Sequence, residues 1–200
     1  MWEANEDNLE AIAMGAGILG AGGGGNPYIG QLRARQAIKE HGPVTVLDPE
    51  ELPEDAQVIC VGGIGAPTVG VEKVRDLQSL YALRAIEEFT GKKATALISN
   101  EIGGSNSVEP LIPAAMTGLP VVDADGMGSA FPEYHRKTFF FYGVPACPMA
   151  MLYDSGNTVI IPVAIIPQWV HALAMVLTVH TCGVPSCCLS PLALLALTRT

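Results

Sequence analysis

Three carboxylates stand where predicted buried strands end, which gives them the type and spacing for acid-base or metal chemistry. Glu101 lies in the run SNEIGGSN, and Asp123 and Asp125 alternate with an alanine in the run DADGMG. A carboxylate at a strand end can accept a proton from water, and two carboxylates on one side of a strand can hold a hard metal ion. We therefore predict catalytic roles for these three residues. Helix capping by Glu101 and turn formation by the two aspartates are the structural alternatives.

Amides and glycines surround these carboxylates and are the candidates for binding a polar substrate. Residues 22–25 are four consecutive glycines, which let a ligand approach the backbone N–H groups because no Cβ is present. The loop lacks the Gly-Lys-Ser/Thr of a Walker A loop, and a helix rather than a strand precedes it, so neither common nucleotide motif is present. A flexible turn is the alternative. The candidate substrate-binding residues are Gly22, Gly23, Gly24, Gly25, Asn100, Gly103, Gly104, Asn106 and Glu133.

A divalent metal is the cofactor type that these residue types suggest. Asp123, Asp125 and His135 are its candidate ligands, although a loop histidine is more often simply solvated. Of the cysteines within the predicted fold, Cys60 lies in a buried strand and is expected in the core, whereas Cys147 lies in the turn PACPM, a setting that could expose its thiol. No histidine stands at a defined distance from Cys147, so nucleophilic catalysis by this thiol has little support.

Composition and charge exclude several classes of partner. The 200-residue chain has a formal net charge of −9 and only 11 basic residues, which argues against a nucleic-acid backbone as partner. The first ten residues are acidic and lack an apolar signal-peptide core, so we expect a cytoplasmic protein. The five cysteines form no C-x-x-C pair and do not resemble a disulfide framework.

Charge is distributed unevenly along the chain. Residues 155–198 contain no Asp, Glu, Lys or Arg. We therefore predict an α/β domain over residues 1–162, followed by an uncharged apolar tail over 163–200 that starts a missing second domain or is a divergent end. A membrane span over 163–179 is disfavoured because Pro167, Gln168 and His171 interrupt it. The alternative is a buried strand and helix that pack on another part of the structure.

Up to residue 123, the pattern predicts alternating helices and strands. Three β-loop-α-β passages in a row imply a parallel sheet with right-handed crossovers, in which ligands bind beyond the carboxyl ends of the strands. That rule places the segments 62–67, 99–106 and 123–128 along one rim, with the glycine loop as a plausible neighbour. The expected helices cover residues 9–19, 28–41, 77–89 and 108–117, and the expected strands cover 44–47, 57–63, 95–99 and 120–123.

The character of the sequence changes at Phe131. Aromatic and β-branched runs separated by turns predict antiparallel strands from there on, and the last two strands form a hairpin around residues 154–157. The predicted fold class is therefore α/β, with a mostly parallel sheet covered by helices and a β-rich C-terminal appendage.

Several long motifs resemble one known family. The runs DNLEAIAMGAGILGAGGGGNP, NEIGGSN, PVVDADGMGSAFPE and YGVPACPMAMLYDSGNTVII are similar, in this order, to the family once listed as DUF917 and now described by its S-methyl thiohydantoin desulfurase (S-Me-THD) N-terminal domain. The resemblance covers about residues 8–161. It implies action on a five-membered hydantoin-like ring, with hydrolytic loss of a methylthio group in the named activity. Family proteins are usually longer, so the resemblance also implies a truncated or alternatively ended chain.

Two positions depart from the pattern of this family. Asn26 stands where an acidic residue is common after the glycines, and Ser129 stands where the family usually has an arginine. Loss of that guanidinium would weaken a clamp on an anion or a ring carbonyl.

Two functions follow from these residues and the resemblance. The first is a hydrolase of hydantoin-like rings, in which the three carboxylates activate water, with or without a metal, and the glycine-loop amides hold a ring carbonyl. The second is a non-catalytic accessory or assembly domain of a hydantoinase/oxoprolinase-like protein. The expected partners are accordingly a small-molecule substrate and a hydantoinase/oxoprolinase-like subunit.

Overall fold

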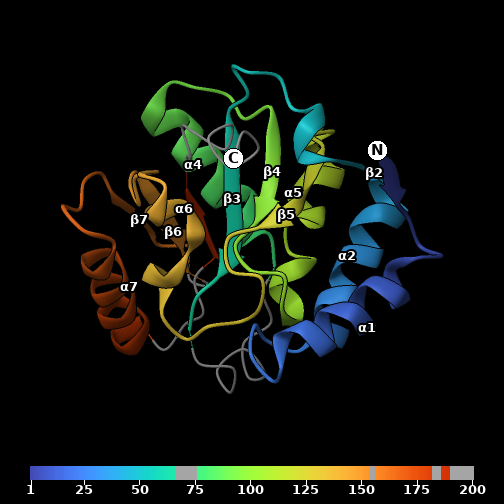
Figure 1. Ribbon diagram of the computed structural model, residues 1–200, viewed down its shortest axis with the longest axis horizontal. Helices are drawn as coiled ribbons and strands as arrows, with labels where there is room; N and C mark the ends of the chain where they lie inside the picture. Colours follow the sequence, from blue (N-terminus) through green and yellow to red (C-terminus); the bar gives the residue numbers. More distant parts are fainter. Residues whose placement is uncertain (66–75, 154–155, 182–185, 190–200) are drawn as a thin grey trace.

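The protein is an α/β structure built on one twisted sheet. The structure, a computed structural model, describes residues 1–65, 76–153, 156–181 and 186–189 (Figure 1). The strands of the sheet lie in the order β1-β2-β5-β4-β3-β8-β6-β7. Along the chain these strands are β1 (Trp2–Ala4), β2 (Val44–Leu47), β3 (Val58–Gly63), β4 (Ala96–Ser99), β5 (Val121–Asp125), β6 (Met149–Leu152), β7 (Thr158–Ile161) and β8 (Ser186–Leu189).

Helices connect the strands and cover both faces of the sheet. Figure 1 shows α1 and α2 at one end of the molecule and α7 at the other, with the sheet between them. The helices are α1 (Leu9–Gly20), α2 (Pro27–His41), α4 (Gln78–Thr90), α5 (Leu111–Thr117), α6 (Thr138–Phe141) and α7 (Pro167–Thr181), and short 3₁₀ turns are η1 (Pro49–Glu51), η2 (Gly104–Ser107) and η3 (Tyr134–Arg136).

The centre of the sheet is parallel. β2 pairs with β5, β5 with β4, and β4 with β3, all in parallel orientation. The residues of β4 are buried throughout, and so are those of β3 up to Gly62, as expected for continuous apolar runs covered on both faces. The predicted α/β fold class is therefore confirmed, and each expected helix and strand up to residue 123 is present within a few residues of its predicted bounds.

Two apolar cores lie on opposite faces of the sheet. Because side chains alternate along a strand, Ile59 and Val61 of β3 face the core formed with α1, α2, α4 and α5. Val58 and Cys60 face the other core, which contains residues of η3, α6 and α7. The helices next to the candidate loops therefore pack on both faces of the sheet.

The β-rich appendage is confirmed, with one correction. β6 and β7 form the expected antiparallel hairpin, and β8 joins β6 to β3, so the appendage extends the central sheet. The segment from Phe131 to Tyr142, however, was expected as strand and instead forms η3 and α6. A strand would turn Phe139 and Phe141 to the same face, whereas Phe139 is buried and Phe141 is 79% exposed.

The two ends of the described chain add elements to this sheet. β1, which the sequence did not indicate, is a three-residue edge strand that pairs antiparallel with β2.

In the segment after residue 162, Val170 and Ala174 of α7 are buried in the second core. The division of the chain at residue 162 stays a prediction. Within the described residues, no helix is long and apolar enough to cross a membrane.

Candidate functional site

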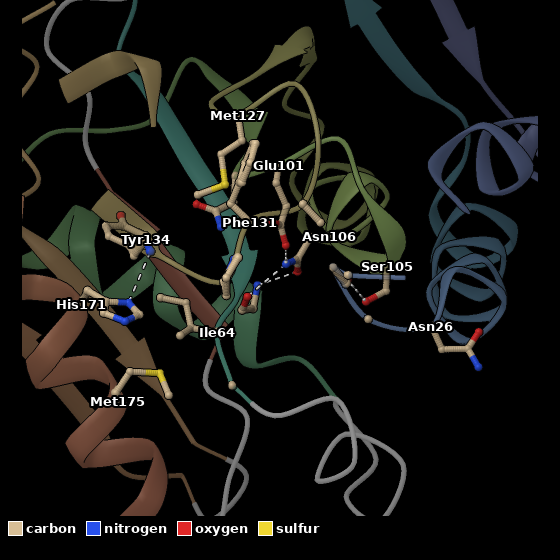
Figure 2. A pocket seen from close by; sticks show the side chains of 18 of the residues that line it. Asn26, Ile64, Glu101, Ser105, Asn106, Met127, Phe131, Tyr134, His171 and Met175 are labelled. Atoms are coloured by element: carbon tan, nitrogen blue, oxygen red, sulfur yellow. Dashed lines mark hydrogen bonds between the residues drawn. The ribbon is translucent and has the colours of Figure 1, made fainter. Parts of the chain in front are cut away.

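A cavity of about 390 Å³ opens beyond the carboxyl ends of β3 and β4 (Figure 2). Its wall brings together the glycine loop, the end of β3, the loop after β4 and the loop after β5, as the rim prediction requires. Residues 66 and 67 of the predicted rim lie outside the described residues. The lining residues are Gly23, Gly24, Gly25, Asn26, Ile29, Gly63, Ile64, Gly65, Asn100, Glu101, Ser105, Asn106, Met127, Ala130, Phe131, Pro132, Tyr134, His171 and Met175.

The glycine loop packs backbone to backbone against the loop after β4. The carbonyl of Gly24 accepts hydrogen bonds from Ser105 Oγ at 3.0 Å and from the N–H of Asn106 at 3.1 Å. A Cβ on Gly24 would lie 2.0 Å from the carbonyl oxygen of Gly103, and the φ of Gly24 is +74°. Both features demand glycine. The glycines therefore serve first to let the two loops touch.

The same loop also contributes backbone to the cavity wall. Gly24 and Gly25 line the cavity, and no acceptor in the described part of the chain bonds the N–H of either residue. Gly23 lines it too, but its N–H bonds to the carbonyl of Gly20 at 2.7 Å, and Gly22 is exposed and lies outside the lining. Of the four predicted binding glycines, Gly24 and Gly25 are thus the two lining residues whose N–H groups have no acceptor within the described residues.

Glu101 is the carboxyl group of the cavity. Its side chain is buried, and its Oε1 accepts a hydrogen bond from Asn106 Nδ2 at a distance of 2.5 Å. Burial raises the pKa of Glu101, while the bonds from Asn106 and from the backbone of Phe131 and the charge of Lys137 act against this rise. A carboxyl group with a raised pKa exchanges protons closer to neutral pH than an exposed one, which suits acid-base work.

Asn106 connects Glu101 to the end of β3. Its Oδ1 accepts the N–H of Gly63 at 2.8 Å, and its Nδ2 donates to the carbonyl of Gly63 at 3.0 Å as well as to Glu101. The Asn106 side chain is buried, and these bonds occupy both its oxygen and its nitrogen. Asn106 is therefore positioned to hold the carboxyl group rather than to bind substrate.

A buried lysine lies behind the cavity wall. Lys137 is fully buried, its Nζ lies 3.8 Å from Cys60 Sγ, and it stands 3.7 Å above the ring of Tyr134, which lines the cavity. Its positive charge lowers the pKa of Glu101. Lys137 does not stand out in the sequence, because nothing in the run HRKTFFF distinguishes a buried lysine from a solvated one.

The two aspartates have other partners than Glu101, although the charge of Asp125 adds to the rise of the Glu101 pKa. Asp125 Oδ2 accepts the N–H groups of Ile102, Met127 and Gly128 at 2.9, 3.0 and 2.7 Å, which is the turn-forming role. Asp123 is exposed, and it accepts a hydrogen bond from Trp2 Nε1 at 3.0 Å. Neither residue lines the cavity. Asp123 lines a separate, mostly apolar hollow of about 230 Å³ beneath α1.

The remaining polar candidates, Glu133 and His135, flank the lining residue Tyr134 in sequence but do not line the cavity themselves. Glu133 forms an ion pair with Arg136, which lowers the pKa of Glu133, and its Oε2 lies 3.8 Å from His135 Nε2. Among the described residues, no group of three or more His, Cys, Asp or Glu side chains is arranged to hold a metal ion. Asp123, Asp125 and His135 are accordingly not gathered as a metal site there.

Four other positions that the sequence singled out either form hydrogen bonds within the fold or are buried. Asn26 Oδ1 caps α2 by accepting the N–H of Tyr28 at 3.0 Å, and Ser129 Oγ donates to the carbonyl of Leu19 at 2.6 Å. Both cysteine thiols, Cys60 and Cys147, are buried, and burial raises the pKa of each. The expectation that the turn exposes the Cys147 thiol was wrong, because this residue packs into the second core.

Several lining residues were missed from the sequence. His171 and Met175 come from α7, which is remote in sequence from the loops that form the rest of the wall (Figure 2). Tyr134 comes from η3, just after the lining residue Pro132. His171 Nδ1 accepts the backbone N–H of Tyr134 at 3.3 Å, and this bond joins α7 to the cavity. No local sequence motif indicates such a contact, because it depends on how α7 packs.

Comparisons with known proteins agree with this architecture. A crystal structure of a protein from Chromobacterium violaceum matches with a TM-score of 0.81 and 26% sequence identity, over 98% of this chain and 56% of that chain. The present chain thus spans little more than half the length of that protein. No curated protein matches. The family described as "S-Me-THD-like, N-terminal domain" matches residues 7–163, and the chain therefore belongs to this family.

Proposed function

We propose that this domain is a hydrolase for hydantoin-like five-membered rings, of the S-methyl thiohydantoin type. The observation that carries the proposal is the buried Glu101 carboxyl group, which Asn106 holds in a cavity whose wall also offers the N–H groups of Gly24 and Gly25. Family membership supports this choice of substrate class. The chain spans 56% of the similar solved chain, and the proposal is made for the 200-residue protein itself.

The reaction replaces the methylthio group by oxygen. Water adds to the ring carbon that carries sulfur, the C–S bond breaks, and the products are a hydantoin and methanethiol. One water proton goes to the ring nitrogen and the other leaves with the thiol, so atoms and charges balance. In this scheme Glu101 takes a proton from the attacking water, and the two glycine N–H groups bind a ring carbonyl oxygen.

The character of the cavity wall supports an uncharged ring as ligand. Its described lining residues include no lysine or arginine, whereas Ile64, Met127 and Phe131 provide apolar surface. Such a wall suits a flat neutral heterocycle better than a phosphate, which needs cations or a dedicated nest. We place the reaction in the cytoplasm as part of the same proposal, in line with the free thiols of Cys60 and Cys147.

An accessory role is the second candidate, and the surface of α7 favours it. Trp169 is 59% exposed and Ile165, just before this helix, is 93% exposed, which is unusual for large apolar residues. A hydantoinase/oxoprolinase-like subunit is the proposed partner for this surface. In that case the domain would be inactive alone and would co-elute with such a subunit.

One experiment tests the hydrolase. The 200-residue protein is incubated with S-methyl thiohydantoin, and released methanethiol is measured with a thiol reagent. We expect release by the wild type and a loss of roughly 10²-fold or more in Glu101→Gln, since general-base catalysis contributes about that much. Asp123→Asn is the matched control, because Asp123 lies outside the cavity. Equal rates for the wild type and Glu101→Gln would refute the assignment, and inactivity of all three proteins would favour the accessory role.

A further inference from the structure

His171 lines the cavity from the side of α7. Figure 2 shows its imidazole beside Met175 and across Ile64 from Glu101 and Asn106, which lie near the centre of the view. His171 and Glu101 are thus titratable side chains on different walls of one cavity. The roles described above do not use this histidine.

A backbone hydrogen bond fixes the orientation of the ring. His171 Nδ1 accepts the N–H of Tyr134 at 3.3 Å. A nitrogen that accepts a hydrogen bond carries a lone pair, so in the neutral imidazole the proton resides on the other nitrogen. Nε2–H is therefore the donor that this side chain can offer.

The surroundings of the ring keep it neutral. Burial lowers the pKa of His171, and the neighbouring His135 lowers it further, while the Glu133 carboxylate has the opposite effect. His135 meets His171 edge to face, with ring centroids 5.9 Å apart. Tyr134, which also packs there, contributes its backbone N–H to the ring. These titratable neighbours leave a neutral hydrogen-bond donor rather than a cation at neutral pH.

We propose that His171 Nε2–H donates a hydrogen bond to the substrate, to the ring nitrogen that gains electron density when water attacks the neighbouring carbon. This rests on the proposed function and extends it by a catalytic residue opposite Glu101. While Glu101 accepts a proton from water, His171 stabilises the charge that develops on the other side of the ring. The pair also sets specificity, since the ligand must present an acceptor toward α7 and an electrophilic carbon toward Glu101.

Three variants on α7 test the role in catalysis. His171→Leu removes the donor at similar volume, and His171→Gln restores an N–H donor without a titrating ring. Leu173→Ala is the control, since this residue on the same helix is 43% exposed and lies outside the cavity lining. With S-methyl thiohydantoin we expect kcat to fall about 10²-fold in His171→Leu, as for loss of one oxyanion donor, with partial recovery in His171→Gln and no change in the control. Full activity of His171→Leu would overturn the inference and leave the proposed hydrolase intact.

A second readout does not need turnover. In protein labelled with ¹⁵N-histidine, NMR at neutral pH should show His171 as the Nε2–H tautomer, and its Nε2 signal should shift when hydantoin is added to saturation. The opposite tautomer, or an unchanged signal, would overturn the inference. If the wild type fails to hydrolyse S-methyl thiohydantoin, the proposed function fails, and this titration still decides whether His171 binds a hydantoin ring.

Discussion

The cavity at the carboxyl ends of the strands and the apolar hollow beneath α1 each contain a carboxylate that the sequence selected, yet their chemistry differs. Glu101 in the cavity is buried, bonded by Asn106 and close to a buried lysine. Asp123 at the hollow is exposed and bonded by an indole N–H. Residue type and strand-end position thus do not set the surroundings of a carboxyl group. Its burial and its hydrogen-bond donors come from loops that meet in space.

The two regions also differ in what builds them. The cavity is held by backbone contacts between glycine-rich loops and by the amide of Asn106, whereas the hollow is lined by apolar side chains such as Ile12 and Leu19. Backbone contacts tolerate no added atoms, while apolar side chains can readjust. Four tests sharpen this contrast, beginning with the largest expected effect.

Gly24→Ala should damage the cavity most. The added Cβ would lie 2.0 Å from the carbonyl oxygen of Gly103 on a residue with φ +74°, so we expect a loss of roughly 3 kcal/mol or more of stability. Gly22→Ala is the matched control, because its φ is +93° but nothing lies within 4 Å of the new Cβ; we expect about 1–2 kcal/mol there. Urea unfolding measures both. Equal losses would show that the two loops do not depend on close contact.

Asn106→Leu should be the next most costly change. It leaves the partly buried backbone groups of Gly63 and the buried carboxyl group of Glu101 without their amide partner, which should cost about 2–3 kcal/mol. For comparison, Ile12→Val at the apolar hollow should cost about 1 kcal/mol. Urea unfolding of both variants measures the two losses of unfolding free energy. A smaller loss in Asn106→Leu than in Ile12→Val would contradict the proposed role of Asn106 in holding the site.

The third test uses pH. Burial raises the folded-state pKa of Glu101 above the usual 4.5, so its favourable contribution is complete below that pH and is lost as pH rises through the folded-state pKa. Glu101→Gln should therefore gain melting temperature relative to the wild type as pH rises above about 4.5. The control has the opposite sign. Although burial opposes it, hydrogen bonds from the Ala94 N–H, Lys93 and Arg84 lower the pKa of Glu87. The contribution of Glu87 is therefore complete above about pH 4.5 and is lost as pH falls through its folded-state pKa. The melting temperature of Glu87→Gln should fall behind that of the wild type as pH rises toward 4.5, and a change in the same direction for both variants would refute the contrast.

The smallest loss of stability is expected at the apolar hollow beneath α1. Trp2→Phe removes the hydrogen bond from the indole to Asp123, and because both side chains are exposed we expect less than about 1 kcal/mol. Methanethiol release should remain unchanged. A large loss of activity in Trp2→Phe would indicate that Asp123 takes part in catalysis, as the sequence alone had suggested.

Much of the fold was predictable because periodicity is local. The apolar runs of β3 and β4, the helix stop at Gly42 and the alternation of helices with strands gave the parallel centre and the rim on which Glu101 and Asn106 lie. The run of phenylalanines from Phe139 failed as a strand because its burial follows packing against the second core rather than alternation. Lys137 and His171 were missed for the same reason, because their places beside the cavity depend on packing and not on a local pattern.

The element order, the family and the loops with the candidate residues can all be recognised from contiguous residues. Three features follow from packing instead: the burial of Glu101, the turn formed by Asp125, and the place of His171 of α7 at the wall of the cavity. Desolvation and hydrogen-bond partners depend on groups far apart in the chain, so no local pattern reports them. A residue's type is local, but its pKa and its donors are properties of the packed molecule.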